Sequence, residues 1–428
     1  MSFHEGYVSD RVIASKNNYN PMRDTFNATA DLIFNPDADI LNIGIAQNDL
    51  MTDILKEKVS ASLSFDPTKD FGYGDPHGSR KLRGLVAELM NRNFKPKIPL
   101  SVDHLLTTTG AGAAVFFLTL GITNPGDSVL VISPYYGNFD SDVCTGSQVD
   151  NILFYPSATN DGDMTIDFNE LEETFENAKV KDNKTIKAVL ITNPHNPLGK
   201  CFSKDSLETV LKFASKHTLH VISDEVYGLS TYSHILDEKR KDPFISLLSL
   251  ESVDQLIDPS LVHIIYGFSK DFCLNGFRVG FIIDQHNELL RQYLKSSALF
   301  SYISSIMDRL LRNMLEDTEW VDSFFTINRR RIADAYTFAT NLLDKNGINY
   351  IPSEAGHFLM IDVTSHPKIN SLDDEKALFV ALLQENVYLA PGHIFHTRKP
   401  GYFRLTFTLD RQKIETGINK FIKALEQI

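Results

Sequence analysis

Between residues 100 and 285 the chain alternates short β-branched runs with helical patterns. The apolar runs are typical of buried strands, and they are SVLVIS (128–133), IKAVLIT (186–192), LHVIS (219–223) and LVHIIY (261–266). Residues 168–178 and 203–217 have the apolar spacing of helices, and Ser203 is of a residue type that caps helix N-termini. This alternation predicts an α/β fold of three layers (αβα), with a mostly parallel sheet covered by helices on both faces.

The C-terminal third of the chain has a different pattern. Residues 304–345 are predicted to form long helices, GHFLMIDV and YFRLTFT are predicted strands, and a last helix is expected from about residue 410. We therefore predict a large domain over 61–304 and a smaller α+β domain from 305–428. Because residues 1–60 show no partner of their own, we group them with the smaller domain as an N-terminal arm.

Composition excludes several classes of partner. A formal charge of −13 without any basic stretch argues against nucleic acid. Cys144, Cys201 and Cys273 are scattered and form neither a disulfide framework nor a zinc spacing, which indicates a reducing compartment. No signal-peptide pattern and no apolar run of about 18 residues are present. We expect a soluble cytoplasmic protein that does not contact a membrane.

Polar residues directly follow the predicted strands. They are Asn193 and Asn196 in LITNPHNPLG, Asp224 and Tyr227 in VISDEVYGL, and Ser269 and Lys270 in IIYGFSKD, with Arg278 a little further on. Ligands of parallel α/β sheets bind at the carboxyl ends of the strands, where these residues should meet. A second signal is the Gly/Ala-rich turn in LLTTTGAGAAVFFL, which predicts a phosphate-binding helix N-terminus.

One chemistry uses all of these groups, namely that of an aldehyde cofactor with a phosphate, a phenolic oxygen and a ring nitrogen. A lysine binds the aldehyde, and a carboxylate keeps the ring nitrogen protonated. Tyrosine and asparagine side chains can hydrogen-bond the phenolic oxygen, while an arginine and backbone amides hold the phosphate. A lone lysine after a strand is more often a surface residue, but the matching positions of Asp224, Asn196 and Arg278 favour a cofactor site around Lys270.

These segments resemble the class I and II aminotransferase family of fold-type I pyridoxal-phosphate (PLP) enzymes. Within that family the chain most resembles the 1-aminocyclopropane-1-carboxylate (ACC) synthase-like branch. The matching segments, in the family's order, are ILNIGIAQNDL, SPYYGNFD, NPHNPLG, DEVY, SKDFCLNGFRVG and PGHIFH. The resemblance covers nearly the full length. It implies pyridoxal 5'-phosphate as cofactor, a small amino-acid substrate, and a homodimer with active sites at the subunit interface.

The resemblance also implies roles for single residues. Lys270 would bind the cofactor and move the proton at the substrate Cα, and Asp224 would pair with the ring nitrogen. The other cofactor contacts implied are Tyr227 and Asn196 at the phenolic oxygen, Tyr136 on the ring (with Tyr135 as its rival), and Gly110, Ala111, Gly112, Ser269 and Arg278 at the phosphate. The substrate contacts implied are Arg404 at the α-carboxylate, Gln47, Tyr19 and Asn196. We expect His393 and His396 to be packing residues, with no metal site.

Three positions depart from the family pattern. Gln47 replaces a glutamate that is expected to face a sulfonium group, so attraction for the cation S-adenosylmethionine should weaken. Gly267 replaces a serine, which removes one hydrogen bond to the phosphate unless Ser269 or Thr109 supplies it. Pro76 replaces a tyrosine that reaches the neighbouring subunit's phosphate, a role that Tyr73 could take over.

The predicted function is that of an ACC synthase-like lyase. It would act on an α-amino acid with a sulfur leaving group, either S-adenosylmethionine or a thioether, through Cα deprotonation and elimination. An aminotransferase using the same residues is the alternative, because binding at the far end of the substrate decides the reaction. A non-catalytic protein that keeps the fold is the remote alternative, and the intact set of cofactor residues argues against it.

Overall fold

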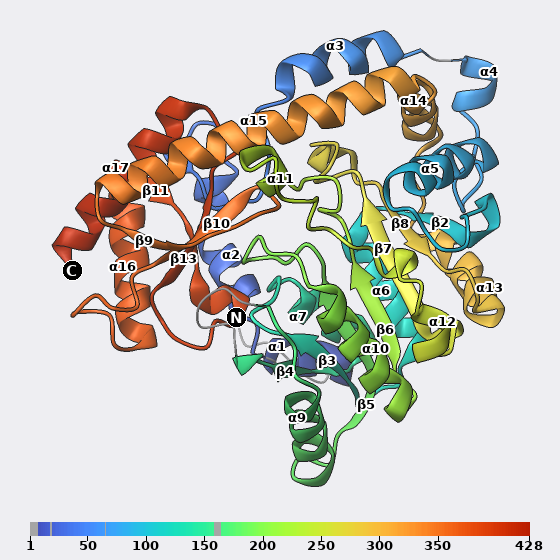
Figure 1. Ribbon diagram of the computed structural model, residues 1–428, viewed down its shortest axis with the longest axis horizontal. Helices are drawn as coiled ribbons and strands as arrows, with labels where there is room; N and C mark the ends of the chain where they lie inside the picture. The colour runs from blue at the N-terminus through green and yellow to red at the C-terminus, as the bar shows by residue number, and fades with distance from the viewer. Residues whose placement is uncertain (1–6, 18, 65, 158–163) are drawn as a thin grey trace.

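A seven-stranded sheet forms the centre of the larger domain in the computed structural model, which describes residues 7–17, 19–64, 66–157 and 164–428 (Figure 1). In spatial order its strands are β2 (Leu105–Thr108), β8 (Gly280–Ile283), β7 (Val262–Gly267), β6 (His220–Asp224), β5 (Thr185–Thr192), β3 (Asp127–Ile132) and β4 (Asp150–Phe154). The pairs from β4 to β7 are parallel, and β8 is antiparallel to both of its neighbours. The predicted fold class is confirmed.

Helices cover both faces of this sheet because its strands are apolar on both sides. Val129 and Val131 pack in one core with α6 (Ala111–Ile122) and α13 (Glu288–Ser297), whereas Leu130 and Ile132 belong to the core on the other face. That second core contains α5 (Arg80–Asn93), α9 (Phe168–Val180) and α10 (Lys204–His217). The Ser203 hydroxyl accepts a hydrogen bond from the amide of Ser206 at 3.2 Å, so the predicted cap of α10 is present.

An antiparallel sheet forms the centre of the smaller domain. Its strands, in spatial order, are β12 (Ala390–Pro391), β13 (Tyr402–Thr406), β10 (Phe358–Asp362) and β9 (Asn349–Ile351). It is covered by α16 (Leu372–Gln384), α17 (Arg411–Gln427) and one end of α15 (Thr318–Lys345), a helix of 28 residues. Figure 1 shows α15 running from the larger domain, beside α14 (Ser305–Leu315), across to the smaller one.

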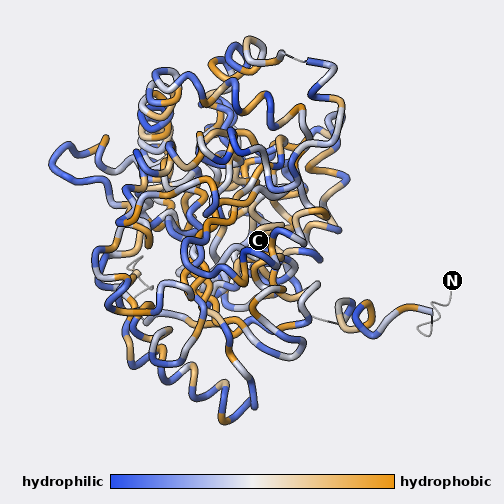
Figure 2. Tube along the Cα trace, turned by 90° about the vertical axis from the view of Figure 1, so that its right-hand side faces the viewer, coloured by the Kyte–Doolittle hydropathy of each residue, from blue (hydrophilic) through white to orange (hydrophobic). Residues whose placement is uncertain are grey.

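The N-terminal segment contacts both domains. Helix α1 (Asp10–Asn17) projects from the body of the molecule (Figure 2), and α2 (Pro21–Ile33) lies between the two domains (Figure 1). Strand β1 (Leu41–Asn42) pairs in parallel with β11 (Val387–Tyr388) of the smaller domain. Helices α3 (Thr52–Ser62) and α4 (Pro67–Asp70) pack on α14.

Short helical turns complete the structure. They are α7 (Phe139–Asp142), α8 (Cys144–Ser147), α11 (Ser233–Leu236), α12 (Val253–Leu256), η2 (Val102–His104), η4 (Leu247–Ser249), η5 (Pro259–Leu261), η6 (Asn275–Phe277), η7 (Ala298–Phe300) and η8 (Gly392–Phe395). In the part of the chain that the structure describes, no helix combines the length and the apolar character needed to cross a membrane.

Candidate active site

The carboxyl ends of β5, β6 and β7 open into a cavity of about 820 Å³ between the two domains. Most of the side chains predicted from the sequence line it together. They are Ala111, Gly112, Tyr136, Asn196, Asp224, Tyr227, Ser269, Lys270, Arg278 and Arg404. Parallel strands bring their carboxyl ends to one edge of a sheet, so residues that are far apart in sequence converge here.

Lys270 lies three residues after the end of β7, in the turn that leads to η6. Its amine donates a hydrogen bond to the carbonyl oxygen of Ala46 at 2.5 Å and lies 5.9 Å from the centre of the Tyr227 ring. Burial lowers the pKa of Lys270 to about 7, and the positive charges of Arg404 and Arg278 add to this effect. An amine with this pKa is about half neutral at pH 7, and its neutral form can attack an aldehyde carbon or accept a proton.

Asp224 is the last residue of β6 and lies beneath the same cavity. One carboxylate oxygen accepts a hydrogen bond from the amide of Val226 at 3.3 Å, and among the described residues no side chain hydrogen-bonds this carboxylate. Burial raises the pKa of Asp224 to about 7, and the charge of Asp142 adds to the effect. The protein alone offsets little of the negative charge of this buried carboxylate. A protonated ring nitrogen would pair with it.

Arg404 is held rigidly at the opposite wall, on β13. Its guanidinium donates to the side-chain oxygen of Asn196 and to the carbonyl oxygen of Gly44, both at 2.8 Å. The group also lies between the rings of Phe358 and Phe395, 4.8 and 4.6 Å from their centres. A buried arginine fixed in this way offers a planar donor surface to a carboxylate.

The Gly/Ala-rich turn at Gly110, Ala111 and Gly112 packs closely against β8, and we call it the phosphate cradle. Gly110 caps α6 with φ +100°, and a Cβ at this position would lie 2.4 Å from a guanidinium nitrogen of Arg278. A Cβ at Gly280 would lie 2.4 Å from the carbonyl carbon of Gly110. The loop therefore brings the N-terminal amides of α6 beside the Arg278 cation, an arrangement that suits a phosphate.

The same packing accounts for Gly267, where the family pattern has serine. A Cβ at this position would lie 3.2 Å from the carbonyl oxygen of Val279 and 3.8 Å from the Cβ of Ala111. The first of these distances is tighter than an ordinary contact, so the backbone around residue 267 leaves little space for a side chain. Ser269 lines the cavity nearby.

Tyr136 and Tyr135 have separate environments. Tyr136 lines the cavity, and burial raises its pKa to about 12. Tyr135 is fully buried, donates to Asp140 at 2.6 Å and stacks on the ring of His396 at 4.5 Å. The structure thus brings Tyr136, and not its neighbour, to the cavity. His396 also hydrogen-bonds Asp140 at 2.8 Å, so it packs as part of this buried polar cluster.

The structure leaves Gln47, Tyr19 and Tyr73 outside the residues that line the cavity. Gln47 is exposed and its amide donates to Asp49 at 3.2 Å, while Tyr19 is 68% exposed and meets the edge of His396. Tyr73 is 97% exposed. The segment around Gln47 reaches the site through the carbonyl of Ala46, which accepts from Lys270. The roles predicted for these three side chains stay predictions.

Two acidic residues of the site were not identified from the sequence. Asp142, in α7, lines the cavity beside Gly112, and burial raises its pKa to about 6. Asp271 is fully buried and accepts hydrogen bonds from the amide of Leu229 at 2.9 Å and the hydroxyl of Ser230 at 2.6 Å. It ties the turn that carries Lys270 to the loop after β6. Its position directly after Lys270 in SKD was the available signal.

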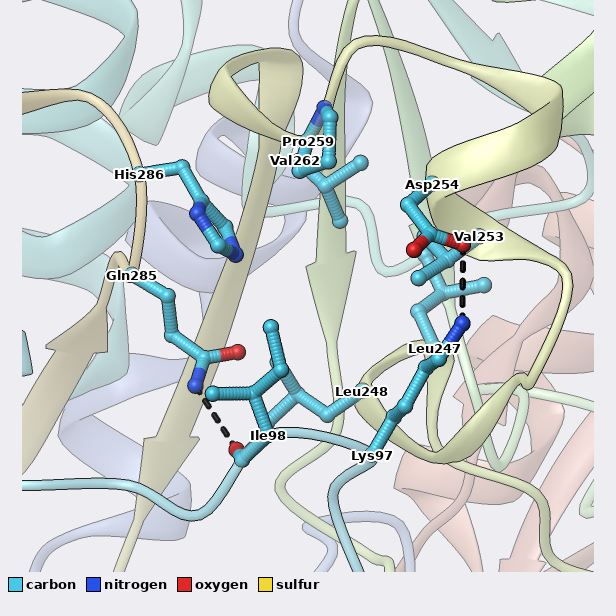
Figure 3. Close-up of a pocket in the computed structure, with 10 residues that line it drawn as sticks. All are labelled: Lys97, Ile98, Leu247, Leu248, Val253, Asp254, Pro259, Val262, Gln285 and His286. Carbon is cyan, nitrogen blue, oxygen red and sulfur yellow. Dashed lines mark hydrogen bonds and ion pairs between the residues drawn. The ribbon is translucent and has the colours of Figure 1, made fainter.

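A second hollow lies at the opposite edge of the sheet, where β7 begins and β8 ends (Figure 3). It has a volume of about 30 Å³ and is bordered by an ion pair of 2.8 Å between Lys97 and Asp254. The amide of Gln285 donates to the carbonyl of Ile98 at 2.8 Å. A space of this size holds about one or two water molecules and no cofactor.

The solved structures that this chain resembles in fold include aspartate aminotransferases. A double mutant of Thermus thermophilus aspartate aminotransferase superposes with a TM-score of 0.78 at 20% identity, covering 97% of this chain and 99% of that one. Thermotoga maritima aspartate aminotransferase gives a TM-score of 0.75 at 23% identity, covering 98% and 100%. The fold and the cavity define a fold-type I PLP-dependent enzyme.

The family follows from sequence comparison. The family model described as aminotransferase class I and II matches residues 38–421, and the chain belongs to this family. A 1-aminocyclopropane-1-carboxylate synthase of Glycine max is 31% identical over 394 residues, which are 89% of this chain and 79% of that protein. A probable aminotransferase of Claviceps purpurea is 28% identical over 399 residues, covering 91% and 90%. The predicted family and cofactor are confirmed.

The cavity has the donors and acceptors that PLP requires. The Tyr227 hydroxyl is buried without a partner among the described residues, although buried hydroxyls are normally hydrogen-bonded. It can therefore donate a hydrogen bond to the phenolic oxygen of the cofactor. Asp224 suits the ring nitrogen, Lys270 suits the aldehyde, and the cradle at Gly110 suits the phosphate. The residues present fit the cofactor at each of its polar groups.

Proposed function

We propose that this protein is a PLP-dependent lyase that eliminates a sulfur leaving group from an α-amino acid after removing the Cα proton. One observation carries the proposal. The Lys270 amine, whose pKa is lowered to about 7, shares a cavity with a rigid arginine suited to the α-carboxylate. The similarity to 1-aminocyclopropane-1-carboxylate synthases supports elimination as the reaction type.

The residues divide the work as follows. Arg404, oriented by Asn196, would hold the substrate carboxylate and so direct the Cα–H bond towards Lys270. Lys270 would accept the Cα proton, since a pKa of about 7 leaves a substantial part of its amine neutral at pH 7. PLP, when bound, supplies the electron-accepting ring that makes this proton acidic. Asp224 would keep the proton on the ring nitrogen on which that acidity depends.

Transamination is the second candidate. It is supported by the similarity to the probable aminotransferase of Claviceps purpurea, which covers nearly the whole of both chains. An aminotransferase would use the same residues, with Lys270 returning the proton to the cofactor instead of completing an elimination. The two reactions therefore differ in the fate of the amino nitrogen. Transamination leaves it on the cofactor, whereas elimination releases it in the product or as ammonia.

A single-turnover experiment separates them. Amino acids with a sulfur leaving group are added to the PLP-loaded protein without any keto acid, and the visible absorption of the lysine-bound cofactor is followed. If the band recovers while a sulfur product and a keto acid with ammonia, or a ring-closed amino acid, accumulate, the lyase proposal is supported. If the band is lost permanently and the amino group stays on the cofactor, the enzyme is an aminotransferase for that substrate.

We also propose that the active form is a homodimer in the cytoplasm. Large apolar side chains are exposed next to the phosphate cradle: Phe71, Tyr73, Leu299 and Phe300, at 70%, 97%, 62% and 86%. Ser301 connects this patch to the cradle, because its hydroxyl accepts from the amide of Thr109 at 3.1 Å. A patch of this kind is typical of a subunit interface. The proposed location has a separate basis, since three unpaired cysteines suit a reducing compartment. Sedimentation of Phe300→Asp, with Val180→Asp as control, tests the dimer.

A further inference from the structure

One wall of the active-site cavity is apolar and comes from α2 and the segments around it. The side chains that form it are Met22, Phe26, Ile33, Phe34, Ile45 and Ile394, and we call them the α2 wall. The rings of Phe26 and Phe34 are 5.4 Å apart, and these residues are 44% and 57% exposed. Two phenyl groups that line a cavity and remain in contact with water offer a binding surface for an apolar side chain.

The helix is fixed in this position from both sides. The Asn20 amide donates to the hydroxyl of Ser141 in the larger domain at 2.9 Å, and its oxygen caps α2 by accepting from the amide of Arg23 at 2.8 Å. Met22 packs against Ile394 and its neighbours in the smaller domain. The α2 wall is thus a built part of the cavity, formed where the two domains meet (Figure 1).

Charge is distributed unevenly around the cavity. Among the described residues that line it, the acidic ones are Asp142 and Asp224, and both lie with the cofactor-binding residues. Asp142 is beside Gly112 of the cradle, and Asp224 ends β6. Arg23 lines the cavity beside the α2 wall, but its charge is offset by an ion pair of 3.0 Å with Asp24 at the exposed side of the helix.

A cationic substrate side chain would therefore meet an unfavourable surface. Desolvating a sulfonium group against apolar side chains costs free energy unless an anion compensates it, and among the described residues no carboxylate belongs to the α2 wall. Phenyl faces attract cations, but this attraction is weaker for Phe than for Trp and is worth only about 0.5–1 kcal/mol where the ring is exposed to water. Gln47 is uncharged, and its exposed side chain donates to Asp49 outside the residues that line the cavity.

We infer that the substrate has an uncharged, apolar side chain, such as a thioether or an aromatic ring, which packs on Phe26 and Phe34, and that sulfonium amino acids are discriminated against. This inference rests on the proposed function, since it assumes that the cavity binds an α-amino acid. It narrows that function to one class of substrate and assigns Phe26 and Phe34 as specificity-determining residues.

The test compares L-methionine with S-methyl-L-methionine, which differ by one methyl group and its positive charge. Each is titrated into the PLP-loaded protein, and the dissociation constant is obtained from the change in visible absorption. We expect methionine and phenylalanine to bind at least about tenfold more tightly than S-methylmethionine. Equal or tighter binding of the sulfonium would overturn the inference.

Variants of the α2 wall test its assignment. Phe26→Ala and Phe34→Ala should each weaken methionine and phenylalanine binding by about tenfold. Leu32→Ala is the matched control, because Leu32 is on the same helix, is 43% exposed and does not line the cavity. Phe26→Asp should reduce the preference for methionine over S-methylmethionine. Unchanged affinities in Phe26→Ala and Phe34→Ala would contradict the assignment.

The outcomes also separate this inference from the proposed function. If no amino acid alters the spectrum of the PLP-loaded protein, the proposed function is wrong and the inference is rejected with it. If amino acids do alter the spectrum but sulfonium compounds bind best, the function stands and only the substrate class is wrong. Because the side chains of Phe26, Phe34 and Leu32 are exposed, their replacement should have little effect on the core. Thermal unfolding of each variant would verify this.

Discussion

Arg404 of the smaller domain donates a hydrogen bond of 2.8 Å to Asn196, which follows β5 of the larger domain. Five segments meet at this contact, because the same guanidinium also bonds the Gly44 carbonyl and lies between Phe358 and Phe395. The position of a substrate carboxylate bound there is consequently fixed relative to Lys270 and Asp224, which belong to the other domain.

Replacing Arg404 by lysine should raise the KM for the amino acid by roughly a hundredfold, because the planar group that can donate two parallel hydrogen bonds is lost. Steady-state kinetics would measure this. Arg411→Lys is the control, since Arg411 also stacks on a phenylalanine, with its guanidinium 5.2 Å from the Phe338 ring centre, but does not line the cavity. A KM for Arg404→Lys within twofold of the wild type would contradict the role of Arg404.

Gly110→Ala should release the cofactor. Its φ of +100° disfavours alanine, and the new methyl group would also displace the Arg278 guanidinium from the phosphate cradle. Gly126→Ala separates the two effects, because Gly126 has φ +89° and no atom lies within 4 Å of the position that its new methyl group would take. Both variants should lose about 1 kcal/mol of stability. Only Gly110→Ala should bind PLP at least about tenfold more weakly, as measured by equilibrium dialysis.

Cofactor capture should depend on pH through Lys270. Burial and two neighbouring arginines lower the pKa of this amine to about 7 in the folded, cofactor-free protein. Only the neutral amine attacks an aldehyde, so the rate of PLP capture should be constant above pH 8. Below pH 7 it should fall by about tenfold for each pH unit. Stopped-flow absorbance measures this rate. A rate that continues to rise up to pH 10 would show that the amine has an ordinary pKa.

Asp224→Asn should make the cofactor-free protein more stable and the enzyme less active. Because burial raises the pKa of Asp224 to about 7, the folded cofactor-free protein binds this proton more tightly than the unfolded chain does. The stability of the wild type should therefore decrease as the pH rises from about 4 to 7, and the variant should lack this loss. At pH 8 we expect the cofactor-free variant to be more stable by up to a few kcal/mol.

In the same variant turnover should fall by at least about a hundredfold, because the ring nitrogen loses the carboxylate that keeps it protonated. Thermal unfolding across the pH range and steady-state turnover are the two measurements. Near-normal turnover in Asp224→Asn would exclude the assigned role, and a lower Tm at pH 8 would contradict the electrostatic argument.

The parts of the site that follow the strands could be predicted from the sequence. Asp224 ends one strand and Lys270 lies three residues after another, and the topology of a parallel sheet brings such positions to one edge. Gly110 was predictable for a related reason, since a small-residue turn between a strand and a helix has few other uses. These inferences depend on local pattern and on one general rule of topology.

The parts that depend on packing between distant segments could not be predicted. The direction of the Gln47 side chain is one example, since its amide donates to Asp49 while the preceding carbonyl accepts from Lys270. In an irregular segment no periodicity indicates where a side chain points. Phe26 and Phe34 were likewise not identified, because an amphipathic helix shows which face is apolar but not which cavity that face covers.

The central claim is that Lys270 holds the cofactor, and chemical trapping tests it most directly. The PLP-loaded protein is reduced with borohydride, digested, and analysed by mass spectrometry for a lysine that carries the reduced cofactor. We predict modification of Lys270, with loss of the visible absorption band in Lys270→Ala. Modification of a different lysine, or a visible band that persists in Lys270→Ala, would contradict the account.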